Sequence, residues 1–328
     1  MNDRISVVGL ALMVIGLGCF RPTFADETKT SREPDREPAF PAESNGWRLI
    51  SAVTQPSLRE SSGLAPSGVR PSVIWSHNDG GAGAFLFAIE AATGKVLQMI
   101  RVKGAPNFDW EDLFVIRGKR QRLLAVADVG DNEKRRKSGA IYVYRESVEG
   151  DRLALEKRRT VRFVYPDGKR FDSEAATFDP ESGSVLILTK SKLKTLLFKV
   201  RLDAEDSGKP LVAEHVGTLT PPPSFPSKGP IVNIKRGIFG TSCTSADVSP
   251  NGKLLAVLTY TDCFLYRRAT DESWATAVAR EPEVLALPSI YQAEALCFSA
   301  DGKSLIVSSE KSPTPLYRTD VPPPARGD

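Results

Sequence analysis

The sequence predicts an all-β protein, a five-bladed β-propeller, on the basis of two observations. First, four stretches share one plan: an acidic residue, a short apolar strand, a turn and a second apolar strand that ends in a polar residue. They span 109–132, 171–190, 244–260 and 292–310, so the unit recurs at intervals of roughly 45–70 residues, as propeller blades do. Second, no long segment shows the 3.6-residue period of an amphipathic helix.

The composition is that of a globular chain. Of 328 residues, 41% are hydrophobic and 26% are charged, which is compatible with one all-β domain of this length. The formal net charge is only +4, and no Lys/Arg stripe interleaved with aromatic residues is visible, so we expect no nucleic-acid partner. We expect a monomer whose partner is a small molecule or another protein.

The N-terminus predicts export to the periplasm or the extracellular space. Residues 5–18 form an apolar run that is too short to span a bilayer comfortably. Small residues at positions 23 and 25 then complete a signal peptide over 1–25. Lipidation at Cys19 is the alternative, and it would be the only membrane attachment. Residues 26–46 are charged and contain proline, so they predict a flexible tether.

The propeller domain is expected over 47–320, with tight turns such as Asn251-Gly252 and Asp301-Gly302 between paired strands. The first blade uses 61–65, 73–76, 84–90 and 95–102, and the second uses 110–116, 123–128, 140–145 and 160–164. The third uses 174–178, 185–189, 195–202 and 212–219, and the fourth uses 245–249, 254–259, 264–268 and 284–287. The fifth uses 293–299, 305–308 and 315–318.

The fifth blade is one strand short. The early strand 47–53 has no other place, so we predict that it completes this blade and that both ends of the chain close the ring. A six-bladed ring remains the alternative, because the Pro- and Gly-rich segment 221–240 is long enough to contain further strands. The Pro-rich tail 321–328 is expected to be disordered.

Polar residues of equivalent blade positions should meet at one mouth of the channel. In an antiparallel meander, the start of each first strand and the end of each second strand reach the same face. The starts of the first strands supply the candidate metal ligands, which are Glu60, Asp109, Glu111, Glu174, Asp247 and Glu294. The ends of the second strands supply the candidate binding residues, which are Asn78, Asp79, Asp128, Lys190, Tyr260 and Glu310.

Converging carboxylates repel one another unless protons, basic side chains or a cation compensate their charge. Ca²⁺ is the expected ion, because it accepts six to eight oxygen ligands in loose geometry. With two histidines and four cysteines in the chain, a zinc site is disfavoured. The competing interpretation is structural: these acids would accept hydrogen bonds from backbone N–H groups and neighbouring blades.

Two of the cysteines form a disulfide candidate. Cys243 precedes the first strand of the fourth blade and Cys263 lies in the turn after its second strand, on the same expected face. Cys297 lies within a first strand and is expected to be a buried free thiol.

Several motifs carry a family resemblance over nearly the whole exported chain. They are the segments 60–64, 75–81, 107–113 and 128–132, with later matches at 174–175, 259–260 and 309–310. Together they resemble a group of uncharacterised exported bacterial β-propeller proteins. More distantly, the chain is similar to SdiA-regulated proteins, to calcium-activated nucleotidases (apyrases) and to phytase-like propellers.

The resemblance implies a propeller with a Ca²⁺ site, in which Glu111, Glu174, Asp247 and Glu294 are the matching carboxylates. It does not imply nucleotidase activity, because arginine-rich nucleotide contacts are not evident and Ser62 replaces the acid of the first blade.

The expected function is that of an exported binding or scaffold protein with an acidic, Ca²⁺-binding channel mouth. The alternative is a Ca²⁺-dependent phosphohydrolase, nucleotidase- or phytase-like, in which Glu111 or Glu174 activates water. Lys190, Lys192 and Lys194 are the cations from a mouth turn that could then hold phosphate. The sequence leaves open whether the protein is an enzyme.

Overall fold

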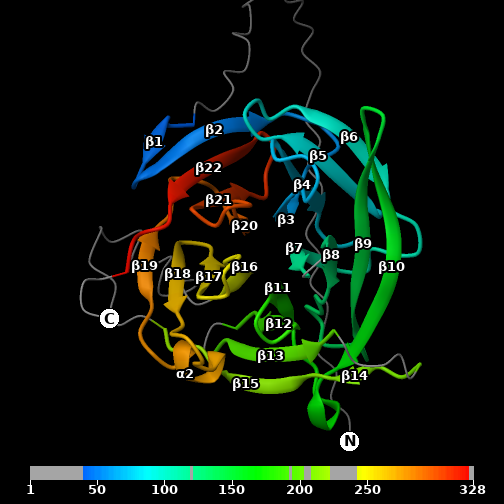
Figure 1. Cartoon of the computed structure of the whole chain (residues 1–328), viewed down its shortest axis with the longest axis vertical. Helices are drawn as coiled ribbons and strands as arrows, with labels where there is room; N and C mark the ends of the chain where they lie inside the picture. The colour runs from blue at the N-terminus through cyan, green and yellow to red at the C-terminus, as the bar shows by residue number, and fades with distance from the viewer. Residues whose placement is uncertain (1–39, 119–120, 192–193, 203–207, 222–241, 325–328) are drawn as a thin grey trace, which may run out of the picture. The chain divides into compact units, whose positions relative to one another are not determined.

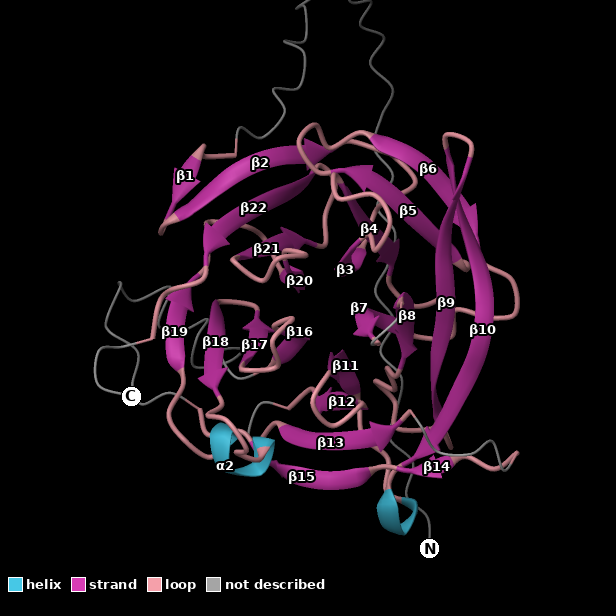
Figure 2. Cartoon of the chain, viewed as in Figure 1, coloured by secondary structure: helices cyan, strands magenta, loops and turns pink. Residues whose placement is uncertain are grey.

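The computed structural model describes residues 40–118, 121–191, 194–202, 208–221 and 242–324. Within them, five sheets stand around a central axis, as Figure 1 shows, and Figure 2 shows how little helix accompanies them. The prediction of a five-bladed all-β propeller is therefore confirmed. The segment on which the six-bladed alternative rests lies outside the described residues, apart from Pro221.

Four strands build three of the blades, and five strands build the other two. Blade 1 contains β3 (Ser61–Pro66), β4 (Val73–Asn78), β5 (Phe85–Glu90) and β6 (Val96–Arg101). Blade 2 contains β7 (Trp110–Arg117), β8 (Arg122–Asp128), β9 (Gly139–Glu149), β10 (Arg152–Val164) and the short parallel strand β14 (Leu211–Val212). Blade 3 contains β11 (Ser173–Asp179), β12 (Ser184–Thr189), β13 (Leu196–Arg201) and β15 (Glu214–Thr218).

Blade 4 contains β16 (Cys243–Val248), β17 (Leu254–Thr259), β18 (Asp262–Arg267) and β19 (Glu283–Ala286). Blade 5 contains β20 (Ala293–Phe298), β21 (Ser304–Ser309), β22 (Thr314–Asp320), β2 (Trp47–Val53) and β1 (Glu43–Ser44). The described helices are the 3-10 turn η1 (Pro166–Gly168) and α2 (Trp274–Val278), whose first turn is capped by Ser273. Every strand predicted from the sequence is present.

Both ends of the described chain close the ring. The N-terminal strand β2 pairs antiparallel with β22, with Arg48 opposite Arg318 and Val53 opposite Thr314. Figure 1 shows this as blue β2 lying beside red β22. The predicted closure is therefore confirmed, because β2 from the start of the described chain joins the blade that β20, β21 and β22 form at its end.

Two predicted boundaries are wrong. The tether was expected to run to residue 46, but β1 pairs with β2 and the Tyr317 hydroxyl donates to the Pro41 carbonyl at 2.7 Å. The tail was expected from residue 321, but Val321 packs against the core and its N–H donates a hydrogen bond to the Lys303 carbonyl. In both cases tertiary partners hold the described part of the segment, residues 40–46 and 321–324, against the propeller.

The core is divided into five clusters, each between two neighbouring blades. Strand β17 shows how the sequence achieves this. Its residues Leu254, Ala256 and Leu258 face blade 5, whereas Leu255 and Val257 face blade 3. Because side chains alternate along a strand, an inner strand must be apolar on both faces when it lies between two blades.

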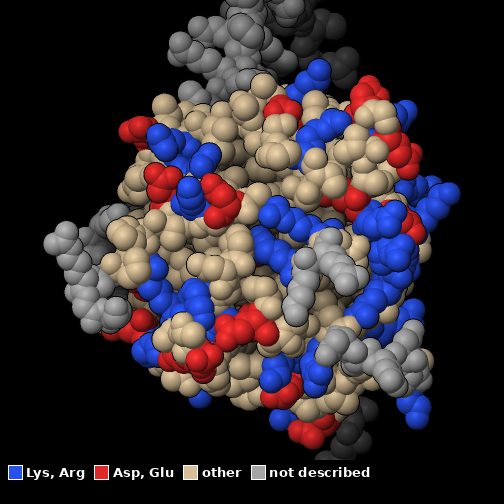
Figure 3. Space-filling model, in the orientation of Figure 1, with Lys and Arg blue, Asp and Glu red and all other residues tan. Residues whose placement is uncertain are grey.

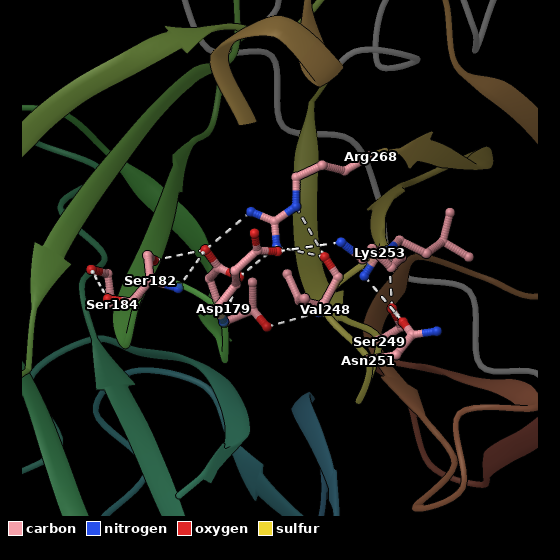
Figure 4. A network of polar contacts seen from close by, with 12 residues as sticks. Asp179, Ser182, Ser184, Val248, Ser249, Asn251, Lys253 and Arg268 are labelled. Carbon is pink, nitrogen blue, oxygen red and sulfur yellow. Dashed lines mark hydrogen bonds and ion pairs between the residues drawn. The ribbon is translucent and has the colours of Figure 1, made fainter. Parts of the chain in front are cut away.

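An ion pair joins blades 3 and 4 on the face opposite the starts of the first strands (Figure 4). Arg268 is 6% exposed, and its Nη2 lies 2.9 Å from Oδ1 of Asp179, which is 1% exposed. The same nitrogen lies 2.9 Å from Oε2 of Glu181, and the guanidinium also donates to the Gly252 carbonyl. This network fixes the far ends of β11 and β18 relative to each other.

Figure 3 shows lysine and arginine side chains gathered where Figure 1 labels β9 and β10. Exposed residues there include Arg145, Lys157, Arg158 and Arg162. Glu156 lies 3.5 Å from Arg145 and 2.8 Å from Arg158, so part of this charge is compensated. Among the described residues, no helix has the length and apolar character needed to cross a membrane.

Candidate metal centre

All five inner strands carry a β-bulge at the same place. In each blade the register of the first strand shifts around its second residue, and the shifted residues are Ser62, Glu111, Glu174, Thr244 and Glu294. A bulge re-aims a side chain that would otherwise alternate across the sheet. The acidic ring expected from the sequence is therefore a ring of bulged residues, three of them glutamates.

The bulges correct one predicted ligand. Asp247 was aligned with the acids of the other blades, but Thr244 holds that position in blade 4. Asp247 lies three residues further along β16, where its carboxylate accepts a hydrogen bond from Thr177 at 3.0 Å and from the N–H of Phe298 at 2.8 Å. The alignment failed because it followed acidic residues, whereas the bulge in this blade carries a hydroxyl.

The bulged hydroxyls have a structural role. Ser62 donates to the Glu111 carbonyl at 3.0 Å, and Thr244 donates to the Ala293 carbonyl at 2.8 Å. Each therefore links its blade to the first strand of the next one. The structural interpretation of the ring therefore applies to Ser62, Thr244 and Asp247.

Three carboxylates meet in a single close group. Ligand oxygens of Asp79, Asp109 and Glu111 all lie within 4.8 Å of one another. Glu111 is 2% exposed, and the other two residues are half-buried. Of the predicted metal ligands, the structure thus brings Asp109 and Glu111 together and adds Asp79, which was expected as a binding residue.

Two glycines make room for this group. A Cβ on Gly130 would lie 2.6 Å from Cγ of Asp109 and would also collide with Oε1 of Glu111. A Cβ on Gly80 would collide with Oδ1 of Asp109 and lie 3.1 Å from its Cα. The carboxylates therefore lie in a cradle that any side chain would fill. The sequence analysis did not predict this role for the two glycines.

The carboxylates of Asp109 and Glu111 accept no hydrogen bond from any other described residue. Burial, together with the charges of Glu174 and Asp79, raises the pKa of Glu111 well above its usual range. Burial and the neighbouring Asp79 likewise raise the pKa of Asp109 to about 6. An almost fully buried carboxylate without a donor needs either a proton or a cation.

Blade 3 supplies a cation to the same mouth. Nζ of Lys190 lies 2.8 Å from Oε1 of Glu174 and 5.6 Å from the centre of the Tyr260 ring, whose hydroxyl it also bonds. Burial raises the pKa of Glu174 to about 7, although Lys190 opposes that shift. Burial acts to lower the pKa of Lys190, but the Glu174 charge outweighs it and the net shift is upward.

Three further predicted residues, Glu294, Glu310 and Glu60, are more exposed than Glu174. Burial and the charge of Glu174 raise the pKa of Glu294 to about 8. Burial and the charge of Glu60 raise the pKa of Glu310. Glu60 is exposed and forms an isolated bridge with Lys311, and it does not join the close group.

Two predicted binding residues instead hold the backbone. The side-chain oxygen of Asn78 accepts hydrogen bonds from the N–H groups of Arg59 (2.8 Å) and Glu60 (3.1 Å). At the equivalent position of blade 2, the fully buried Asp128 accepts the N–H of Asp109 at 3.0 Å and pairs with Arg136 at 2.8 Å. Asp128 therefore positions the backbone of a candidate ligand and does not face the mouth.

The disulfide candidate is wrong. Cys243, Cys263 and Cys297 are all buried free thiols, which confirms the expectation for Cys297. Cys243 belongs to the core between blades 3 and 4, whereas Cys263 belongs to the core between blades 4 and 5. The two thiols lie on opposite faces of one sheet, on strands separated by β17, so the Cα separation is about 9–10 Å and exceeds the reach of a disulfide.

No family model matches the chain, and no curated protein matches it. Among solved structures, a gluconolactonase from Xanthomonas campestris is similar with a TM-score of 0.40 and 11% identity, over 85% of this chain and 92% of that one. At these values the likeness supports no inference about the chemistry of this chain.

Proposed function

We propose that the channel mouth binds one divalent cation, Ca²⁺, through Asp79, Asp109 and Glu111, and that the protein acts as a binding or scaffold protein. The observation that carries the proposal is the carboxylate of Glu111, which is 2% exposed and has no hydrogen-bond donor among the described residues. The glycine cradle supports it, because the two glycines let the backbone lie against these carboxylates, which a side chain there would displace. An all-oxygen donor set suits Ca²⁺ and not zinc.

Two measurements test the metal centre. Calorimetric titration of the full chain with Ca²⁺ should give one binding event, and EGTA should lower the melting temperature. A ligand that binds only the native state at about 100 times its Kd stabilises it by about 2.7 kcal/mol. Glu111→Gln should abolish both effects, because the amide keeps the shape of the side chain but removes the charge.

Glu60→Gln is the matched control, since it removes a charge from the same mouth but from a residue outside the close group. It should bind Ca²⁺ as the unmodified chain does. Equal melting curves with Ca²⁺ and EGTA for the unmodified chain would overturn the proposal.

A second candidate function is a Ca²⁺-dependent phosphohydrolase, which one observation favours. Glu174, whose pKa is raised to about 7, lies in the same mouth as the close group. Its Oε1 forms an ion pair with Nζ of Lys190 at 2.8 Å. A carboxylate with such a pKa accepts a proton from water near neutral pH. Bound Ca²⁺ would supply charge for a developing anion. Glu174→Gln should then remove phosphatase activity while Ca²⁺ binding persists.

Export is part of the same proposal. The signal peptide over 1–25 and the lipidation alternative at Cys19 lie outside the described residues. Mass spectrometry of the protein recovered from cells should find a mature chain that begins at Asp26. A chain that begins at Met1 would contradict export.

A further inference from the structure

The positive charge of the chain is concentrated in one segment of blade 2. Residues 133–170, which include β9 and β10, contain 12 basic and 6 acidic residues and so carry a formal net charge of +6. The whole chain carries only +4, so the rest of the chain is net negative. In Figure 3 the excess is visible as the lysine and arginine side chains gathered over β9 and β10.

Strand β10 presents an open edge on this side of the molecule. It has 13 residues, so it extends over about 40 Å. Its inner edge pairs with β9, and the strand described on its outer edge, β14, pairs with Phe163 and Val164. Residues 152–162 therefore lack a partner strand among the described residues, although the side chain of Gln98 bonds the backbone of Leu153 there.

Exposed basic side chains follow one another along this edge. They are Arg152, Lys157, Arg158, Arg159 and Arg162. Glu156 lies 2.8 Å from Arg158 and shares its other oxygen with Arg145 of β9 at 3.5 Å, so one carboxylate serves two guanidinium groups. All three side chains are 44% exposed or more, and such pairs contribute little.

The other cations of β10 keep their charge. Lys157 and Arg159 donate to carbonyl oxygens, which are neutral. Arg152 and Arg162 form no ion pair with a described carboxylate. The buried Glu146 of β9 does not face solvent with them, because its oxygens accept the Trp75 ring N–H at 3.0 Å and the Gly68 N–H at 2.7 Å. The edge is therefore a row of cations with little compensation.

One structural role of such a row is to keep edge strands apart. Basic residues prevent an open edge from pairing with another sheet, and a bulge between Lys157 and Arg159 interrupts the regular edge further. The edge is therefore not suited to accept an added strand. A partner that contacts side chains is still compatible with it, and its chemistry follows from what the two strands expose.

The two strands expose charge and almost no apolar surface. Their aromatic residues Tyr142, Tyr144 and Phe163 are at most 5% exposed, so bases of a single-stranded nucleic acid would find no ring on which to stack. Val148, at 44%, is the large apolar side chain that they expose among the described residues. A membrane surface would therefore gain little apolar burial here. An extended partner with regularly spaced anions fits a row of cations best.

We propose that the outer edge of β10 binds an acidic polysaccharide whose carboxylates lie along the row of cations. Arginine suits this role, because its planar guanidinium forms paired hydrogen bonds with a carboxylate. The choice of a polysaccharide rests on the proposed export, since such polymers occur outside the cytoplasm, and not on the metal centre. These are not the cations that the sequence suggested for anions: Lys190 pairs with Glu174, and Lys192 lies outside the described residues.

The test uses polygalacturonate as the probe and its methyl ester as the uncharged polymer with the same backbone. Calorimetry on the full chain in EGTA should detect the acid and not the ester. The affinity should fall steeply with salt, because the row of cations replaces counterions of the polyanion. In the double variant Arg152→Gln/Arg162→Gln it should fall at least about tenfold, since charge-assisted contacts are lost.

Arg48→Gln/Arg318→Gln is the matched control, because it removes two exposed arginines that lie opposite each other on β2 and β22 of blade 5. It should leave the affinity unchanged. Equal binding of acid and ester would overturn the role of charge, and an unchanged affinity in Arg152→Gln/Arg162→Gln would overturn the location on β10. If the row serves only to keep edges apart, polygalacturonate should not bind and this variant should form larger oligomers.

Two further probes decide the class of partner. Tighter binding of single-stranded DNA, or of phosphatidylglycerol vesicles, than of polygalacturonate would overturn the assignment to a polysaccharide. All of these measurements are made without Ca²⁺, so a missing Ca²⁺ binding event overturns the metal centre alone. A chain recovered with Met1 contradicts export but leaves the binding results on β10 intact.

Discussion

Nζ of Lys190 lies 2.8 Å from Oε1 of Glu174, whereas the other buried glutamates of the channel mouth, Glu111 and Glu294, have no such partner among the described residues. The mouth therefore has two unlike halves. Blade 3 brings its own cation, whereas the close carboxylate group of blades 1 and 2 forms no ion pair with a described lysine or arginine. If the proposed Ca²⁺ binds, we expect it beside Asp79, Asp109 and Glu111 and not at the centre of the mouth.

The glycine cradle predicts a selective loss of metal binding. Gly130→Ala should reduce Ca²⁺ affinity by about 10–100-fold, because its methyl group would displace the carboxylates of Asp109 and Glu111. Gly217→Ala is the matched control, since its new Cβ would find the nearest atom at 3.6 Å. Calorimetric titration of both variants checks this. Equal affinities in the two would show that the cradle does not shape the metal site.

The buried glutamates predict how stability without metal depends on pH. Burial raises the pKa of Glu294 to about 8, so the native state keeps a proton there that the unfolded chain releases above its ordinary pKa of 4.5. This contribution is present below pH 4.5 and is lost as the pH rises towards about 8. Asp109, at about 6, acts in the same direction.

Glu294→Gln isolates this effect. In EGTA, the variant should lose less unfolding free energy than the unmodified chain between about pH 6 and pH 8.5. Urea denaturation at several pH values measures it. His77, whose pKa burial lowers to about 4, acts oppositely and only below its ordinary value of 6.5. Parallel stability curves for the two proteins above pH 6.5 would contradict the prediction.

Asp247 should behave as a structural residue and not as a ligand. Asp247→Asn should cost about 1–3 kcal/mol of unfolding free energy, because the amide can replace only part of the bonds to Thr177 and Phe298. Its Ca²⁺ affinity should equal that of the unmodified chain. Chemical denaturation and calorimetry on the same sample separate the two effects, and a weakened Ca²⁺ affinity would restore Asp247 to the ligand set.

The ion pair between Asp179 and Arg268 should stabilise the fold without affecting the mouth. Asp179→Ala should cost about 3–5 kcal/mol, because it leaves a guanidinium that is only 4% exposed without its buried partner. Glu181→Ala removes the other carboxylate of Arg268, which is 41% exposed, and should cost about 0–1 kcal/mol. Urea denaturation compares the two. Equal losses would mean that burial does not decide the strength of this network.

The sequence by itself determined the fold. Strands such as β17 are apolar on both faces, their turns carry Asn-Gly or Asp-Gly, and the unpaired strand 47–53 had one remaining place. These signals are local and periodic, so they can be recognised without knowing which strands pair with one another. The same signals put Asp79, Asp109 and Glu111 at one mouth, because equivalent ends of a meander reach one face.

Only the tertiary structure decided which of these residues act together. The bulges shifted the ring from Asp247 to Thr244, the alternation of faces separated Cys243 from Cys263, and long-range pairing assigned Lys190 to Glu174. Each of these outcomes depends on a register shift of one residue or on contacts between blades. A local sequence pattern encodes neither the shift nor the contacts.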